Sequence, residues 1–188
     1  MRRVREEVEG LKKKFNYLNC LETGTIRTYT EKHESTRHIS EVIGLDGHLK
    51  SLDIEPKHIA VSKDICKNRD NITWIECDSH DYLSKDTDKY HFVLLDSVND
   101  PDFIMKEFRL IAKRVHDGGS IMVDDAGTDM GGNYTPNPNE RFQAKKGWAV
   151  WDWCKANDVD SHIVLGGHST QVLIPITEKN SKIFKEMF

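Results

Sequence analysis

The sequence predicts an α/β fold, namely a Rossmann-like, doubly wound sheet of seven strands that is mostly parallel and has a C-terminal antiparallel hairpin. Two observations predict it. Short apolar runs alternate with helical patterns along the chain, and several of these runs end in an acidic residue. The run from Phe92 to Leu95 is apolar without alternation, which indicates a strand buried on both faces. Strands that alternate with helices favour parallel pairing through crossover helices.

The expected elements follow in order. Apolar residues at helical spacing predict an N-terminal helix within residues 1–16. We expect strands at 18–22, 49–54, 72–76, 91–96, 120–123, 161–165 and 170–176, and helices at 35–43, from 57, at 102–115 and at 147–157. Residues 127–146 are polar, aperiodic and rich in Gly, Asn and Pro, so we expect a lid loop there.

Length and charge limit the classes of function. A chain of 188 residues can bury one core, so we expect a single domain over 1–188. The net charge of −4, from 27 basic and 31 acidic residues, offers no general positive field to a nucleic acid, and we expect no nucleic-acid partner. No apolar run approaches the roughly 18 residues that span a bilayer, so we expect no membrane partner.

The four cysteines occur singly, without CxxC pairs. Single cysteines in apolar segments favour buried free thiols, and therefore a reducing, cytoplasmic environment. The sequence does not determine the oligomeric state, and a homodimer is one possibility.

The segment from Leu18 to Pro56 predicts a strand, a loop, a helix and a second strand that ends on an acid. A glycine turn and a helix N-terminus offer free backbone N–H groups, and a carboxylate after the second strand can accept both hydroxyls of a ribose. This unit therefore favours an adenosine-bearing ligand. Strand alternation selects Asp53 as the ribose acid, with Glu55 in reserve. The loop after Gly24 has no second glycine before Gly44, which excludes GxGxxG and Walker loops.

Two further polar positions have alternative interpretations. Ser35 begins the helical pattern at 35–43, where an N-cap is better supported than a ligand contact. Asp78 lies just past a strand end and can either accept a hydrogen bond from an adenine amino group or form an ordinary Asx turn.

Three acids follow two neighbouring strands of the expected sheet. Asp96 ends one strand, and Asp124 and Asp125 end the next. With no cation nearby in the sequence, three converging carboxylates would repel one another unless a divalent ion lay between them. Oxygen ligands suit Mg²⁺, Mn²⁺ or Ca²⁺ rather than zinc. The alternative is that these acids cap helices or face water.

The strand ending in Glu-Thr-Gly-Thr, the acid Asp53, the Asp78-Ser79 pair and the terminal hairpin together resemble the class I S-adenosylmethionine-dependent methyltransferases over nearly the whole chain. The resemblance implies S-adenosylmethionine as cofactor. The implied cofactor site consists of Glu22, Thr23, Gly24, Thr25, Ser35, Asp53, Asp78, Ser79 and Asp96.

Within that class, Leu95-Asp96-Ser97, Val123-Asp124-Asp125 and Gly147-Trp148-Ala149-Val150 resemble the metal-dependent O-methyltransferases of macrolide and aminocoumarin sugar tailoring. The resemblance implies Mg²⁺ bound by Asp96, Asp124 and Asp125, and methyl transfer to a small hydroxylated acceptor. It also implies a proton acceptor, for which Asp96 is the first candidate. His80 and His168 are further candidates because they fall near predicted strand ends, although a structural or surface role is better supported for each. The first loop departs from the family pattern, because residues 26–36 replace its glycine-rich turn.

Two other functions stay open. A nicotinamide-dependent oxidoreductase would use the same βαβ geometry, but the missing glycines argue against it. A nucleotide-binding or S-adenosylmethionine-binding module without catalysis would keep the cofactor site and lack turnover.

Overall fold

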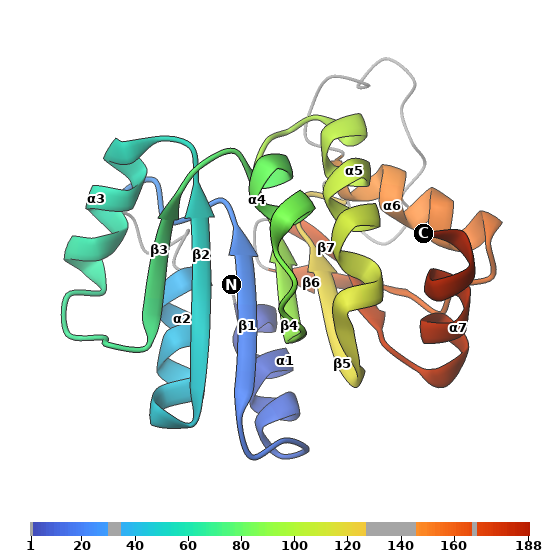
Figure 1. Ribbon diagram of the computed structural model, residues 1–188, viewed down its shortest axis with the longest axis horizontal. Coiled ribbons are helices and arrows are strands. Elements are labelled where there is room, and N and C mark those ends of the chain that lie inside the picture. Colours follow the sequence, from blue (N-terminus) through green and yellow to red (C-terminus); the bar gives the residue numbers. More distant parts are fainter. Residues whose placement is uncertain (1, 30–34, 127–145, 167–168) are drawn as a thin grey trace.

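The computed structural model describes residues 2–29, 35–126, 146–166 and 169–188. In these ranges seven strands form one sheet, with helices on both faces (Figure 1). The strands are β1 (Leu18–Thr23), β2 (Gly47–Asp53), β3 (Ile72–Glu76), β4 (Tyr90–Leu95), β5 (Val115–Val123), β6 (His162–Gly166) and β7 (Ser169–Pro175). The helices are α1 (Arg2–Lys12), α2 (Ser35–Ile43), α3 (Pro56–Ile65), α4 (Ser79–Lys85), α5 (Pro101–Ile111), α6 (Lys146–Ala156) and α7 (Glu178–Met187).

The strand order is β3-β2-β1-β4-β5-β7-β6. Strands β1 to β5 pair in parallel, whereas β7 is antiparallel to both β5 and β6. The predicted fold class is therefore confirmed. From β1 the chain builds outward through β2 and β3, then returns to add β4 on the other side. The order thus reverses between β1 and β4, which is where open α/β sheets bind their ligands.

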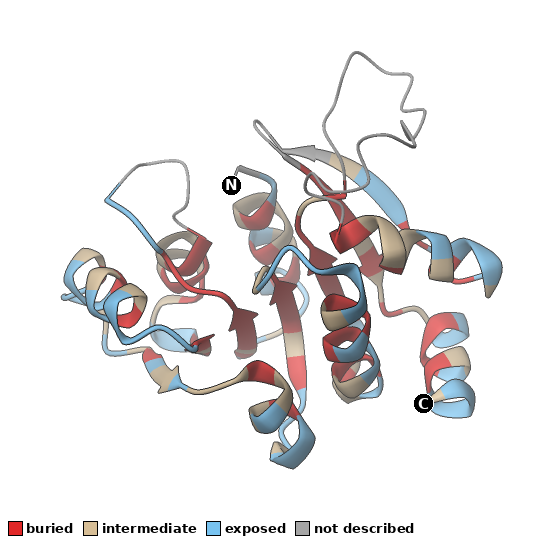
Figure 2. Ribbon diagram, turned by 90° about the horizontal axis from the view of Figure 1, so that it is seen from above, coloured by how far each residue is buried: buried red, intermediate tan, exposed pale blue. Residues whose placement is uncertain are grey.

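The core consists of two apolar layers, one on each face of the sheet. Alternate strand residues point to opposite faces. Cys20 and Phe92 pack with α1 and α2, while Leu21 and Val93 pack with α4, α5, α6 and α7. Figure 2 shows the buried strands between helices whose outer surfaces are exposed.

The structure corrects several expected element boundaries. The helix expected at 102–115 ends at Ile111, and the strand expected from Ser120 begins at Val115. Gly118, with φ of +83°, lies inside that strand instead of forming a turn before it. The expected lid was 127–146, but Lys146 is the first residue of α6. The rest of that segment, 127–145, lies outside the described residues.

Two helices were not expected. The carboxylate of Asp78 caps α4 by accepting hydrogen bonds from the N–H groups of His80 and Asp81. The hydroxyl of Thr177 caps α7 by accepting from the N–H of Asn180. Both are ordinary N-caps, which satisfy N–H groups that the first turn of a helix leaves unpaired.

Cysteine state and helix length bear on the expected environment. All four cysteines are free, and Cys20, Cys66 and Cys154 are buried, as the sequence predicts. No described helix is long and apolar enough to cross a bilayer. A cytoplasmic location stays a prediction.

Candidate active site

A cavity of about 430 Å³ lies where β1, β2, β3 and β4 end. This volume falls within the range of small-molecule sites, and its place at the reversal of strand order fits the general position of ligands in such folds. Four of the predicted site residues line it, namely Gly24, Asp53, Asp78 and Ser79.

Gly24 forms the turn that ends β1. Its φ of +82° lies in the left-handed region, and a Cβ there would overlap the carbonyl group of Asp96. The N–H of Gly24 donates to the carbonyl oxygen of Leu52 at 2.8 Å, and the N–H of Asp96 donates to that of Thr23 at 2.9 Å. Only glycine fits this close contact, which joins the ends of three strands at the floor of the cavity.

Asp53 is held in a fixed orientation at the end of β2. Its Oδ1 accepts from the N–H of Glu55 at 2.9 Å and lies 3.2 Å from Nδ1 of His58. Its Oδ2 accepts from the N–H of Thr25 at 3.2 Å. An ionised carboxylate can accept about four hydrogen bonds, so Asp53 retains capacity for a ligand hydroxyl. The reserve acid, Glu55, lines the cavity too.

Glu22 lies behind the cavity rather than on its wall. Its side chain is fully buried and accepts hydrogen bonds from the hydroxyls of Ser35, Thr36 (2.6 Å) and Ser51 (2.9 Å). Burial raises the pKa of Glu22 to about 7, although these hydroxyls oppose the shift. Glu22 and Ser35 thus tie the start of α2 to β1 and β2, and direct contact of either with a cofactor stays a prediction.

Thr23 and Thr25 are also buried beside the cavity. The hydroxyl of Thr25 donates to Oγ of Ser62 at 2.7 Å, and the hydroxyl of Thr23 donates to Oε2 of Glu107 at 3.1 Å. Glu107, on α5, was not predicted. It is a fully buried carboxyl whose pKa is raised by burial against the effect of the hydroxyls of Ser79 and other neighbours. Its only sequence signal is an acid on the otherwise apolar face of a helix.

Apolar side chains that the sequence did not single out form other walls. Ile54, Val98 and Phe103 line the cavity, and Ile54 is 62% exposed, which is high for an isoleucine. His80 stacks on Phe103 with ring centroids 3.7 Å apart, and its Nε2 lies 2.9 Å from the Phe103 carbonyl oxygen. The cavity therefore combines carboxylates with apolar side chains.

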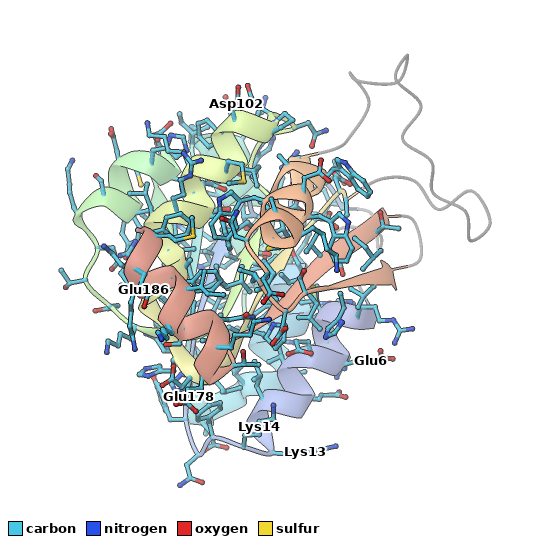
Figure 3. The ribbon with its side chains drawn as sticks, turned by 90° about the vertical axis from the view of Figure 1, so that its right-hand side faces the viewer. Glu6, Lys13, Lys14, Asp102, Glu178 and Glu186 are labelled. Carbon is cyan, nitrogen blue, oxygen red and sulfur yellow. The ribbon has the colours of Figure 1, made fainter. Side chains whose placement is uncertain are left out.

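The basic segment at 12–14 lies far from this cavity. Figure 3 shows Lys13 and Lys14 at the end of the molecule opposite to Asp102, which is adjacent to the cavity residue Phe103. Lys12 donates to the carbonyl oxygens of Val42 and Ile43 at the end of α2. Lys12 therefore joins the end of α1 to the end of α2.

Asp96, Asp124 and Asp125 do come together, as predicted, with one oxygen of each within 4.8 Å of the others. A fourth group joins them. Nζ of Lys146 lies 2.6 Å from Oδ1 of Asp96 and 3.5 Å from Oδ2 of Asp125, and this side chain is only 1% exposed. Nε2 of Gln171 donates to Oδ1 of Asp124 at 3.0 Å. The premise that no cation of the chain reaches these acids is therefore wrong.

The charges of this cluster shift its titration. Burial and the neighbouring Asp124 raise the pKa of Asp96 to about 7, although Lys146 opposes them. The pKa of Asp125 is raised for the same reasons. Burial alone would lower the pKa of Lys146, but Asp96 and Asp125 outweigh it and raise that pKa. Lys146 is therefore an ammonium bound to two of the three predicted metal ligands, and a divalent ion does not fit beside it in this arrangement.

Local backbone geometry brings Lys146 to the acids. Asp125 has φ of +53°, which is unusual for a residue other than glycine. The N–H of Gly147 donates to the carbonyl oxygen of Asp125 at 3.2 Å, and a Cβ on Gly147 would lie 2.8 Å from that of Asp124. The start of α6 is thus packed directly on the end of β5. Of the two histidines predicted as further proton acceptors, His168 lies outside the described residues, and His80 stacks on Phe103.

Neither a protein-family model nor a curated protein matches this chain. Solved structures do. The O-methyltransferase TomG of Streptomyces achromogenes, involved in tomaymycin synthesis and solved with S-adenosylmethionine, matches with a TM-score of 0.67 at 17% identity over 94% of this chain and 80% of its own.

The chain has the fold of the class I methyltransferases. An O-methyltransferase of Bacillus cereus in complex with SAH matches with a TM-score of 0.66 at 13% identity, over 94% of this chain and 81% of its own. An rRNA methylase of Streptococcus thermophilus matches equally well, with a TM-score of 0.66 at 8% identity over 93% and 94% of the two chains. The methyltransferase fold thus serves different acceptors, and the acceptor must be argued from the site.

Proposed function

We propose that this protein is an S-adenosylmethionine-dependent methyltransferase that methylates an oxygen of a small hydroxylated molecule. The observation that carries the proposal is the cavity at the reversal of strand order. Gly24 forms its floor against the backbone of Asp96 and Ser97, and Asp53 on its wall can still accept a hydrogen bond. The likeness to methyltransferases solved with S-adenosylmethionine or SAH supports it.

In this proposal the cofactor's ribose lies against Asp53 and its adenine lies near Ser79 and the apolar wall. Of the two carboxylate oxygens of Asp78, only Oδ1 accepts the hydrogen bonds that cap α4. A carboxylate oxygen can therefore still accept from an adenine amino group. Ile54 and Phe103 offer apolar surface to the base.

The methionine part would extend past Gly24 toward Asp96. The sulfonium carries a positive charge, and acids border this path, whereas Arg27 is bound to the carbonyl oxygens of Asp96 and Ser97 at 2.8 and 2.5 Å. Because the chain carries a net charge of −4, it attracts the positively charged sulfonium of the cofactor more strongly than the neutral thioether of SAH.

Methyl transfer needs an oxygen nucleophile in line with the sulfonium methyl group and an acceptor for its proton. The S–CH₃ bond breaks as the O–CH₃ bond forms, which leaves a thioether and a methyl ether. We propose that Asp96 takes the proton. Its Oδ1 is held by Lys146, its Oδ2 makes no hydrogen bond within the described part of the chain, and its raised pKa suits a base that works near neutral pH.

The acceptor is proposed from charge and size. The acidic balance and a cavity of about 430 Å³ support a small molecule rather than a nucleic acid. No step of this proposal depends on Mg²⁺, because Lys146 lies among the acids that were predicted to bind it.

Calorimetric titration with SAH tests the cofactor directly. We expect saturable, one-to-one binding by the wild type, lost in Gly24→Ala. Absence of binding by folded wild type would refute the methyltransferase proposal. Binding of a nicotinamide dinucleotide in competition with SAH would instead favour an oxidoreductase.

A screen of hydroxylated acceptors with S-adenosylmethionine then tests catalysis, with SAH release as the readout. Turnover that Asp96→Asn abolishes would support O-methylation. SAH binding without turnover on any acceptor would favour the binding module.

A further inference from the structure

The buried ammonium of Lys146 stands where the sequence led us to expect a metal ion. Its Nζ contacts Oδ1 of Asp96 and Oδ2 of Asp125, two of the three acids whose oxygens converge within 4.8 Å. The third acid, Asp124, accepts a hydrogen bond from Gln171. Each acid of the cluster therefore has a donor from the chain itself.

A divalent ion would need the same oxygens. Mg²⁺ and Ca²⁺ take six or more oxygen ligands at short distance, so the ion would have to displace Nζ from Asp96 and overcome repulsion by a second positive charge a few ångströms away. The Lys146 side chain is only 1% exposed, so it would have to leave this buried site to make room for the ion. The ammonium and a metal ion are therefore alternatives.

Lys146 also lies where a positive charge is stable only when carboxylates pair with it. It lies in the first turn of α6, where the helix dipole disfavours a positive charge. The packing of Gly147 on the Asp124 carbonyl group fixes that turn against the end of β5. A lysine held at an unfavourable helix end, and desolvated there, is retained only because the carboxylates pair with it.

We propose that Lys146 is the resident cation of the Asp96, Asp124 and Asp125 cluster, and that it excludes divalent metal ions from this site. Lys146 is then a positioning residue that acts through Asp96, by fixing Oδ1 so that Oδ2 faces the reaction. The metal exclusion depends on the cluster alone, and only the positioning role rests on the proposed function.

Titration with Mn²⁺ followed by electron paramagnetic resonance tests the exclusion without any assay of activity. The wild type should bind no Mn²⁺ below about 1 mM, whereas Lys146→Met should gain one site with at least about tenfold tighter binding, because three acids then lack a cation. Lys155→Met removes an exposed lysine from the same helix and should gain none. Lys146→Arg keeps the charge and should also gain none.

The outcomes separate the two proposals. Tight Mn²⁺ binding by the wild type that Asp124→Asn abolishes would overturn the inference, and this result needs no lysine variant. A folded Lys146→Met protein that gains no site would overturn it as well. SAH binding, measured in parallel, reports on the proposed function independently.

The positioning role has its own readout. If turnover is found, Lys146→Met should lower kcat more than it raises the KM for S-adenosylmethionine, and Lys146→Arg should restore part of kcat. Equal loss in both variants, with unchanged folding, would contradict positioning by charge.

Discussion

The backbone N–H of Thr25 lies 3.2 Å from Oδ2 of Asp53, so the loop after β1 and the end of β2 are joined by a hydrogen bond at the side of the cavity. Asp53 thereby holds the first loop in place. In the proposed function, the same carboxylate also accepts a hydrogen bond from the ribose.

Replacing Asp53 with Asn should weaken SAH binding by about 10- to 100-fold, because a hydrogen bond to a charged group contributes roughly 1.5–3 kcal/mol. Glu55→Gln is the matched control at the same strand end, where the acid is 51% exposed and should cost far less. Calorimetry measures both. The reverse ranking would move the ribose contact to Glu55.

Gly24→Ala should abolish SAH binding and destabilise the fold by about 1–3 kcal/mol, since the added Cβ meets the Asp96 carbonyl group at a positive φ. Gly10→Ala is its control. No atom lies within 4 Å of a Cβ at Gly10, so that helix change should stabilise the protein by about 0.5–1 kcal/mol. Urea unfolding measures the stability of both variants, and equal free energies of unfolding would contradict the prediction.

Glu22→Gln should flatten the pH dependence of stability. The pKa of Glu22 in the folded protein is about 7, above its ordinary 4.5, so the protonated carboxyl stabilises the fold fully below 4.5 and this contribution is lost as the pH rises through 7. The loss is on the order of 3 kcal/mol. Urea unfolding across that interval measures it, and parallel wild-type and variant curves would rule out this origin.

Asp96→Asn should lower kcat by about 10²- to 10⁴-fold, the range that a general base contributes, while SAH still binds. Asp117→Asn, an exposed acid near the other end of β5, controls for the loss of one negative charge. Stopped-flow or steady-state release of SAH gives the rates. Retained turnover in Asp96→Asn would transfer the role of base to another group.

Local pattern explains how much of the fold could be predicted. The apolar residues of β2 and β4 carry their burial in the sequence itself. The edge strand β3 and the helix α2 have the expected bounds. Helix α7 was missed because few apolar residues mark it, and only Phe184 is a buried hydrophobe there. The early start of β5 was missed because Gly118 and Gly119 read as a turn, although the strand continues through them.

The candidate site was predictable only at strand ends. Asp53 is the last residue of β2, and Gly24 and the three clustered acids follow the ends of β1, β4 and β5, so their positions follow from topology. Lys146 stands 50 positions from Asp96 in sequence, and no local pattern links them. The same holds for Glu107 and Thr23, which are 84 positions apart and meet through helix packing.

The state of the cysteines has a practical consequence. Cys77 lines the cavity and is half-buried, whereas Cys20, Cys66 and Cys154 are buried. Burial, followed by the charges of Asp78 and Asp81, raises the pKa of the Cys77 thiol, so it reacts slowly but selectively. The rate at which a fluorescent maleimide modifies Cys77 therefore reports whether the cavity is occupied. Any compound that fills the cavity shields this sulfur, and acceptors can be sought through that protection before a single turnover has been observed.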